Sequence, residues 1–369
     1  MLKSFENVVI GGGLAGLIAT NLLAKEGKQV LLIEKKTYPF HRVCGEYISN
    51  EVKGFLKREG LFPEAHELPQ IDRFTFSDTK GRETTVPLDL GGFGLSRYVF
   101  DDFLVQKGAE KGAEIYTGIQ VEQIEFQNDQ FILQLSDGSE LQAKNVIGAF
   151  GKRSKLDKVL ARDFIQKRSP YIGVKYHIKA AIDRKAVALH NFSGGYCGIN
   201  AIEDGKANLC YLGNRDQLRT YGSIPEMEEA ILWKNPHLKE LFTTSEFLFE
   251  KPEVINEINF ESKNPVESHI LMAGDSAGLI TPLCGNGMAM AIQAGKLAAE
   301  AILTKKSRSE IEQNYEMNWR RIFETRLKVG RTVQLLFGSD YSSTIARNLI
   351  QHVPFVARKI IANTHGQSF

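Results

Sequence analysis

A glycine-rich stretch near the start of the chain has the residue types and the spacing of a phosphate-binding turn. It reads Gly11-Gly12-Gly13-Leu14-Ala15-Gly16 and fits the pattern GxGxxG. The first glycine of this pattern permits a tight turn, the second lets a pyrophosphate approach the backbone, and the third lets the following helix pack on the strand. The helix N-terminus then offers free N–H groups and a positive dipole to the phosphates. We therefore expect a dinucleotide to bind at Gly11, Gly13, Leu14, Ala15 and Gly16.

The sequence around this turn predicts the strand–helix–strand unit that the turn requires. Residues 7–10 are a short apolar strand, residues 14–25 have helical spacing, and residues 30–33 form the next strand. Parallel strands joined in this way need a crossover helix on one face. Glu34 follows the second strand with Lys35 beside it, and its carboxylate can accept hydrogen bonds from an adenosine ribose. A glycine-rich turn without a ligand is the weaker reading in this context.

A second motif near residue 275 indicates which dinucleotide binds. The stretch from His269 to Met288 resembles the second FAD motif of the p-hydroxybenzoate hydroxylase-type flavoproteins, a superfamily that includes the geranylgeranyl reductases. The resemblance implies that Gly274-Asp275 binds the ribityl chain and that the helix start Gly285-Asn286-Gly287-Met288 faces the flavin pyrimidine. A helix N-terminus also favours the negative charge that a reduced flavin carries. Standing alone, Asp275 would be read as a loop or capping aspartate.

Three further stretches extend the resemblance over most of the chain. The segment from His41 to Ser49, with Arg42, Cys44 and Gly45, resembles the cysteine-glycine-glutamate segment of geranylgeranyl reductase-like proteins, which lies beside the flavin. The stretch with Arg97 resembles the family's helix start, in which an arginine approaches FAD. The stretch with Val121 resembles the family's strand whose backbone touches adenine. Surface ion pairing is the alternative for both arginines. Cys44 is the tentative catalytic residue, with packing as its alternative role.

The substrate is predicted to lie against a sheet in the middle of the chain. Candidate substrate contacts are Tyr196, Ile199, Asn200 and, from the second motif, Pro282. Geranylgeranyl reductases carry a Tyr-x-Trp-x-Phe-Pro signature in this sheet, and the chain lacks its Trp and Pro, so a geranylgeranyl chain is not implied. Phe150 replaces an acid that the family commonly has, which puts the handling of a nicotinamide nucleotide in doubt.

Composition excludes several other classes of protein. Lys and Arg number 46 against 44 Asp and Glu, which gives a net charge of +2 and no nucleic-acid footprint. The four cysteines form no CxxC pair, so neither a zinc site nor a disulfide framework is expected. There is no signal peptide pattern and no run of about 20 apolar residues. We expect a cytoplasmic protein without an integral membrane span and without a bound metal.

The order of the predicted elements gives the fold class. We expect an α/β protein, α+β overall, in which a Rossmann-like FAD-binding βαβ lobe carries an inserted antiparallel-sheet substrate lobe and C-terminal helices. Residues 1–70, 95–165 and 265–304 are assigned to a discontinuous FAD-binding domain, 71–94 and 166–264 to the substrate domain, and 305–369 to a C-terminal helical segment. That segment mixes basic and apolar residues, and it either caps the second lobe or makes peripheral contact with a membrane.

These features predict an FAD-dependent oxidoreductase. The reading placed first is a monooxygenase that hydroxylates a lipophilic or aromatic small molecule. NADPH or NADH would visit as a transient reductant, because the chain has no second GxGxxG unit. The alternatives are a geranylgeranyl reductase-like alkene reductase and a flavin-binding protein without turnover.

Overall fold

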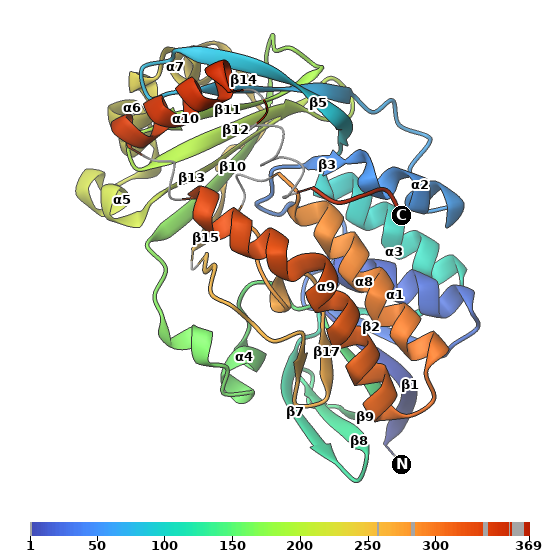
Figure 1. Ribbon diagram of the computed structural model, residues 1–369. Helices are drawn as coiled ribbons and strands as arrows, with labels where there is room; N and C mark the ends of the chain where they lie inside the picture. Colours follow the sequence, from blue (N-terminus) through green and yellow to red (C-terminus); the bar gives the residue numbers. More distant parts are fainter. Residues whose placement is uncertain (1, 257, 282–284, 335–338, 354, 356–364) are drawn as a thin grey trace.

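The chain forms two sheets, one in each of two lobes, and so confirms the predicted fold class (Figure 1). The computed structural model describes residues 2–256, 258–281, 285–334, 339–353, 355 and 365–369. In Figure 1 the N-terminal strand lies in the lower lobe, and the sheet from the middle of the chain lies in the upper lobe.

The sheet of the first lobe is mostly parallel and is built from both ends of the chain. Its order is β16-β17-β9-β1-β2-β6. The strands are β1 (Lys3–Ile10), β2 (Val30–Glu34), β6 (Glu114–Thr117), β9 (Glu140–Gly148), β16 (Val266–Glu267) and β17 (Ile270–Met272). The pairs β1–β2, β1–β9, β2–β6 and β9–β17 are all parallel. A hairpin of β7 (Val121–Gln127) and β8 (Gln130–Leu135) joins β9.

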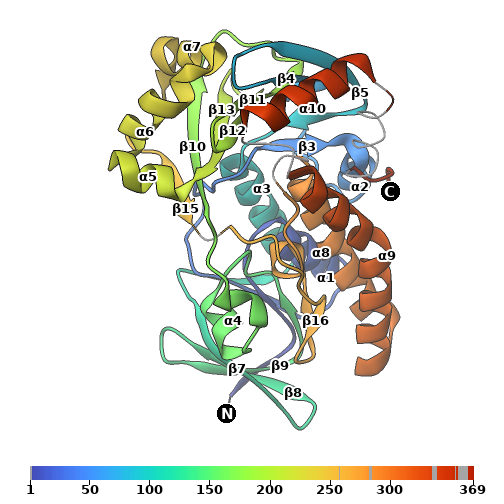
Figure 2. The ribbon, with the colours of Figure 1, turned by 60° about the vertical axis from the view of Figure 1, so that its left-hand side comes forward.

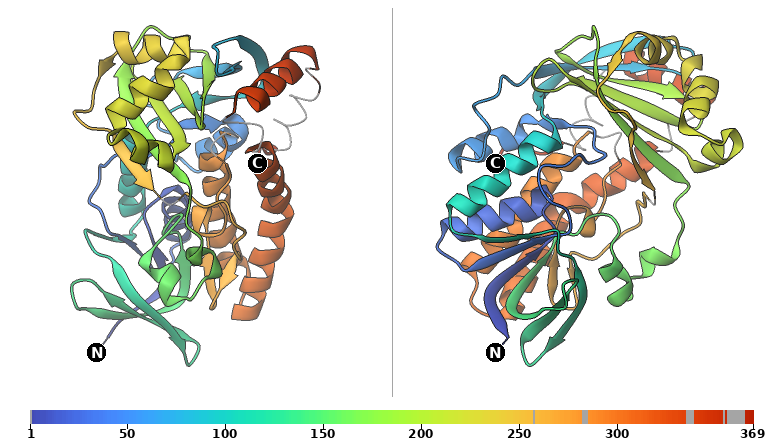
Figure 3. Two further views of the ribbon diagram at one scale, coloured as in Figure 1. Left: turned by 90° about the vertical axis from the view of Figure 1, so that its left-hand side faces the viewer. Right: turned by 180° about the vertical axis from the view of Figure 1, so that it is seen from behind.

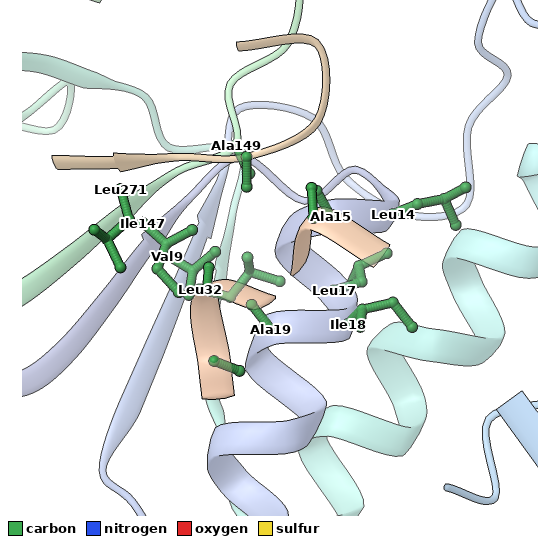
Figure 4. Packing of buried hydrophobic residues seen from close by; sticks show 14 of the residues in the cluster. Val9, Leu14, Ala15, Leu17, Ile18, Ala19, Leu32, Ile147, Ala149 and Leu271 are labelled. Carbon is green, nitrogen blue, oxygen red and sulfur yellow. The ribbon is translucent and has the colours of Figure 1, made fainter. Parts of the chain in front are cut away.

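Helices pack on this sheet because its central strands are apolar on both faces. The helices are α1 (Leu14–Lys25), α3 (Arg97–Glu110) and α8 (Gly287–Thr304), and α1 contacts β1, β2 and both other helices. Figure 4 shows Val9, Leu32 and Ile147 of the sheet beside Ala15 and Ala19 of α1. Strands buried on both faces read as continuous apolar runs, and this is why the sequence revealed them.

The second sheet carries nine strands. Its path is β14-β10-β13-β12-β11-β4-β5-β3, and β15 pairs with β10. The strands are β3 (Tyr47–Ser49), β4 (Gln70–Ser77), β5 (Glu83–Gly94), β10 (Tyr171–Lys179), β11 (Ala186–Phe192), β12 (Gly195–Ala201), β13 (Ala207–Asn214), β14 (Glu246–Phe247) and β15 (Glu253–Asn256). The helices α5 (Arg215–Tyr221), α6 (Ile224–Ile231) and α7 (Pro236–Thr244) belong to the same lobe (Figure 2).

Two details of the second sheet differ from the expectation. The sheet is not wholly antiparallel, because β4 and β11 pair in parallel. A long stretch of chain separates these two strands, so no hairpin forces them to run in opposite directions. In addition, β3 pairs with β5 although its residues fall within the 1–70 range that was assigned to the FAD-binding domain. The domain division itself stays a prediction.

The C-terminal part is helical. The helix α9 (Arg308–Gln334) packs against α8, and α10 (Asp340–His352) lies across β4 and β5 (Figures 2 and 3). Shorter helices are α2 (Lys53–Arg58), α4 (Lys155–Val159) and the 3₁₀ turns η1 (Asn50–Val52), η2 (Asp163–Gln166), η3 (Leu232–Lys234) and η4 (Gly274–Ser276). Within the described ranges, every helix is too short or too polar to cross a bilayer.

Candidate active site

A cavity of about 960 Å³ brings the two sequence motifs together between the lobes. Its wall includes the first βαβ unit, the segment 40–47, the turn before α8 and one face of the second sheet. The predicted site residues in the wall are Gly11, Gly13, Leu14, Ala15, Glu34, Lys35, Arg42, Cys44, Gly45, Arg97, Val121, Tyr196, Asn200, Gly274, Asp275, Gly285, Gly287 and Met288. Residues from opposite ends of the sequence thus share one concave site of ligand-binding size.

A different physical reason explains the glycine at each of the three motif positions. Gly11 has a φ of +102°, and a Cβ there would collide with the backbone of Ala149. A Cβ at Gly16 would collide with the carbonyl oxygen of Gly11, so this glycine lets helix and strand pack closely. Gly13 has an ordinary φ of −86°, and the described atom nearest to its would-be Cβ is Arg97 Nη2 at 3.6 Å. The protein itself does not require a glycine at Gly13, so a ligand that approaches the backbone explains it.

Gly45, which also lines the cavity, supports the same conclusion. Its backbone is not left-handed, and no atom of the described residues lies within 4 Å of a Cβ built on it. The opening in front of Gly45 therefore suits a ligand that lies flat against the chain. Together, Gly13 and Gly45 show that the residues present fit an extended dinucleotide such as FAD.

Glu34 closes β2 and is buried beside the glycine turn. Its Oε2 accepts hydrogen bonds from the backbone N–H of Gly12 at 2.8 Å and from Arg42 Nη2 at 3.1 Å. Its Oε1 accepts one from the N–H of Lys36 at 3.0 Å. An ionised carboxylate has about four acceptor positions, so Glu34 retains capacity for a ribose hydroxyl.

The two predicted arginines share one carboxylate that sequence reasoning did not single out. Arg42 Nε lies 2.9 Å from Asp101 Oδ2, and Arg97 contacts both Asp101 oxygens at 2.7 and 2.8 Å. The ion-pair alternative is therefore observed for both, and both also line the cavity. Asp101 follows Arg97 by one helical turn, and this spacing is a signal that could have identified it.

Asp275 lies in η4 on the cavity wall. Burial raises the pKa of its carboxyl group, while the nearby cations Lys263 and Lys152 act in the opposite direction. Lys263 Nζ also donates to the backbone oxygen of Asp275 at 2.8 Å and so fixes this turn.

A buried ionic cluster beside Cys44 was missed by the sequence analysis. Lys175 Nζ lies 2.5 Å from Glu46 Oε1, and His177 Nε2 lies 2.7 Å from Glu46 Oε2. The side chains of Glu46 and Lys175 are fully buried. Burial alone raises the pKa of Glu46, but Lys175 and His177 outweigh it and lower the pKa to about 2. The available signal was the pair Lys175 and His177, two residues apart in β10, since such residues share one face of a strand.

The cysteines of the site are neutral thiols. Burial raises the pKa of Cys44, against the effect of Arg97. Burial likewise raises the pKa of Cys210, which also lines the cavity, to about 12. Thiolate is the nucleophilic form of cysteine, so the geometry does not favour a nucleophilic role for Cys44. Cys284 lies outside the described residues.

Three of the predicted site residues that the structure describes are not in the cavity wall. Gly16 is buried under the turn, and Asn286 donates to Glu51 Oε1 at 3.2 Å. Ile199 packs in the core on the other face of the second sheet, because successive side chains of a strand alternate between faces. Pro282 lies outside the described residues. No three His, Cys, Asp or Glu side chains in the described part of the chain are placed to hold a metal ion.

Comparisons with known proteins agree with this geometry. The family model "FAD binding domain" matches residues 5–246. The digeranylgeranylglycerophospholipid reductase of Methanosarcina acetivorans is 27% identical over 343 residues, which cover 87% of this chain and 81% of the relative. Protein FixC of Escherichia coli O157:H7 is 25% identical over 354 residues, with 87% and 82% covered.

Solved structures share the fold at low sequence identity. PqsL of Pseudomonas aeruginosa in complex with 2-aminobenzoylacetate has a TM-score of 0.75 at 15% identity and covers 92% of this chain and 98% of its own. A geranylgeranyl bacteriochlorophyll reductase-like protein of Thermoplasma acidophilum has a TM-score of 0.77 at 19% identity, with 99% and 97% covered.

Proposed function

Because the chain belongs to the FAD binding domain family and is an FAD-dependent oxidoreductase, we propose that it reduces a carbon–carbon double bond of a lipophilic small molecule. The similarity to a named reductase carries the choice of reaction, and the apolar part of the cavity wall carries the choice of a lipophilic substrate. Beyond the flavin-binding motifs, the wall continues over Val86, Leu88, Leu189, Leu349 and Ile350, from the second sheet and α10. An apolar wall of this kind favours a lipophilic ligand, since its burial removes apolar surface from water.

Hydroxylation of a lipophilic or aromatic substrate is the second candidate. The sequence analysis placed it first. The 27% identity to a named reductase over most of the chain supports reduction, whereas PqsL is similar at 15% identity and shares the fold. One observation still favours hydroxylation: Tyr196-Cys-Gly-Ile-Asn200 lacks the Trp and Pro of the reductase signature.

FAD would supply the electron chemistry, and the protein would supply binding, orientation and exclusion of water. The glycine turn and the N-terminus of α1 would hold the pyrophosphate, and Glu34 would hold the adenosine ribose. Asp275 would hold the ribityl chain. In the reductase reaction reduced FAD would supply a hydride to one alkene carbon, and the other carbon would take up a proton. NADPH or NADH remains the proposed reductant. Phe150, which lines the cavity where the family commonly has an acid, leaves the protein without that contact.

An anaerobic experiment separates the two reactions. The FAD-loaded protein is photoreduced without oxygen and mixed with digeranylgeranylglyceryl phospholipid or with 2-aminobenzoylacetate. Return of the oxidised flavin spectrum before air is admitted, together with a reduced product, supports alkene reduction, because only a substrate that accepts electrons can reoxidise the flavin. Reoxidation only in air, with an oxygenated product, supports hydroxylation. Reoxidation in air without any altered substrate would contradict both reactions.

A further inference from the structure

Polar side chains on the cavity face of the second sheet hold the segment that borders the flavin position. We propose that Lys175, His177 and Asn208 are positioning residues that fix Cys44, Gly45 and Glu46 against the flavin ring. The sheet on which the substrate is proposed to lie thereby sets the geometry of the cofactor site. This inference rests on the proposed flavin function and adds residues that neither motif contains.

The contacts come from neighbouring strands and converge on a few peptide units. Asn208 Nδ2 donates to the backbone oxygens of Cys44 at 3.1 Å and of Gly45 at 2.9 Å. Lys175 Nζ donates to Glu46 and also to the backbone oxygen of Arg42 at 3.1 Å. His177 lies opposite Asn208 in the register between β10 and β13, so the two side chains project from the same face.

Stability alone does not explain these groups. A buried ion pair is often no more stabilising than apolar residues of similar volume. The Oδ1 atom of Asn208 is buried without a hydrogen-bond partner among the described residues, which is unfavourable. The backbone of Glu46 is left-handed, with a φ of +53°, a conformation that is unfavourable for a residue with a side chain. Strain of this kind persists where surrounding contacts fix it, and such sites cluster at functional positions.

The position of the segment from Arg42 to Glu46 explains what these contacts do. Arg42, at its start, is bound to the nucleotide end of the site through Asp101 and Glu34. Glu46, at its end, is bound to the second sheet, and it also accepts the backbone N–H of Arg97 at 2.8 Å. The segment therefore spans both lobes, and Gly45 between these anchors is the residue that leaves space for a ligand. Its placement depends on the donors of the second sheet.

The test compares two buried asparagines of one sheet. Asn208→Ala removes both hydrogen bonds that Asn208 donates to the segment, and Asn191→Ala is the matched control. Asn191 is also buried, donates to one backbone oxygen, that of Ser77 at 2.8 Å, and has an unpartnered Oδ1 among the described residues. The measurements are the dissociation constant of FAD, the visible flavin spectrum and the Tm of the FAD-free protein. None of them needs a substrate, so failure of the proposed reaction would leave this test intact.

We expect Asn208→Ala to weaken FAD binding about tenfold and to shift the visible spectrum. The control should bind FAD within twofold of the unmodified protein and should lower the Tm of the FAD-free protein by a similar amount. A second pair tests the donor at position 177. His177→Gln keeps an N–H for Glu46, and its dissociation constant for FAD should stay within about threefold of that of the unmodified protein. His177→Phe has no such N–H, and its dissociation constant for FAD should rise by more than about threefold. Unchanged FAD affinity and spectrum in Asn208→Ala, with only the Tm lowered, would overturn the proposal.

Discussion

A buried glutamate lies against each face of the second sheet, and the surroundings shift the pKa values of the two carboxyl groups in opposite directions. On the cavity face, burial raises the pKa of Glu46, but its contacts with Lys175 and His177 outweigh this effect and lower the pKa to about 2. On the other face, the side chain of Glu228 in α6 accepts hydrogen bonds from the hydroxyls of Tyr176 and Tyr211, at 3.0 and 2.9 Å. Burial raises the pKa of Glu228 to about 7, although the two tyrosine hydrogen bonds act in the lowering direction.

The difference separates the part of the sheet that is built for a ligand from the part that is built for packing. On the helix-covered face the pKa of Glu228 is raised to about 7, as expected for a buried carboxyl group whose hydrogen-bond donors in the described part of the chain are uncharged hydroxyls. The cavity face keeps full charges buried and holds them with hydrogen bonds to a strained segment. Charge is retained on the face where the flavin and the substrate are proposed to meet.

The largest expected effect is on the free energy of unfolding of Glu46→Gln. This change leaves the ammonium group of Lys175 buried without its anion, and removal of one partner from a buried pair costs about 3–5 kcal/mol. Urea unfolding of the FAD-free protein measures it. Glu114→Gln is the control, because its pair with Lys3 is exposed, at 42% and 53%, and should leave stability unchanged. Equal free energies of unfolding for the two variants would mean that the buried charge of Glu46 on the cavity face contributes no more to stability than the exposed charge of Glu114.

The second prediction uses pH to distinguish the two glutamates. The folded-state pKa of Glu228 is raised from 4.5 to about 7, so the folded protein binds this proton more tightly than the unfolded chain. Its stabilising effect is complete below about pH 4.5 and is lost as the pH rises to about 7, with a slope of at most about 1.4 kcal/mol per pH unit. Glu228→Gln should remove this slope in urea titrations between pH 5 and pH 7.

Glu46 should show the opposite dependence. Its folded-state pKa is lowered, so its contribution is present above about pH 4.5 and is lost as the pH falls toward 2. If Glu228→Gln left the slope between pH 5 and pH 7 unchanged, the assignment of a near-neutral acid to the packing face would be wrong.

The contrast between local and distant contacts also explains how much could be predicted from the sequence. The βαβ unit was predicted correctly because Gly11 to Glu34 is continuous in the chain and each glycine has a local reason. The helix start predicted at residues 285–288 is confirmed as the beginning of α8, but the close crossing of α8 with α1 was not foreseen. That crossing needs Gly295, since a Cβ there would collide with the backbone of Ala15.

The second sheet was harder to predict because its contacts join residues that are far apart in sequence. Lys175 and Glu46 are separated by 129 positions, and no local pattern pairs them. Tyr196 and Asn200, two of the candidate substrate contacts, lie four residues apart on one face of β12, and both line the cavity. Ile199 was included with them against the alternation of side chains along a strand, and it lies on the packing face.

Two glycines at opposite ends of the cavity give the third prediction. Gly13 and Gly198 both line the cavity, and the described atom nearest to a Cβ on either lies 3.6 Å away, so valine should fold at both positions. Gly13→Val should weaken FAD binding roughly 100-fold, about 2.7 kcal/mol, because the pyrophosphate needs that space. Gly198→Val should retain FAD and lose substrate-dependent reoxidation of the flavin. Full FAD occupancy in Gly13→Val would contradict the assignment of the nucleotide end.

The smallest effect is expected from Cys44→Ser. The thiol is neutral because burial raises its pKa, and serine is close to it in size, so FAD affinity should change by less than about threefold. Turnover measured with the reduced, substrate-exposed protein should also change by less than about threefold if Cys44 only packs beside the flavin. A loss of turnover of more than tenfold with unchanged FAD affinity would instead place the thiol in the chemistry. The segment held by Asn208 would then position a reacting group as well as the cofactor.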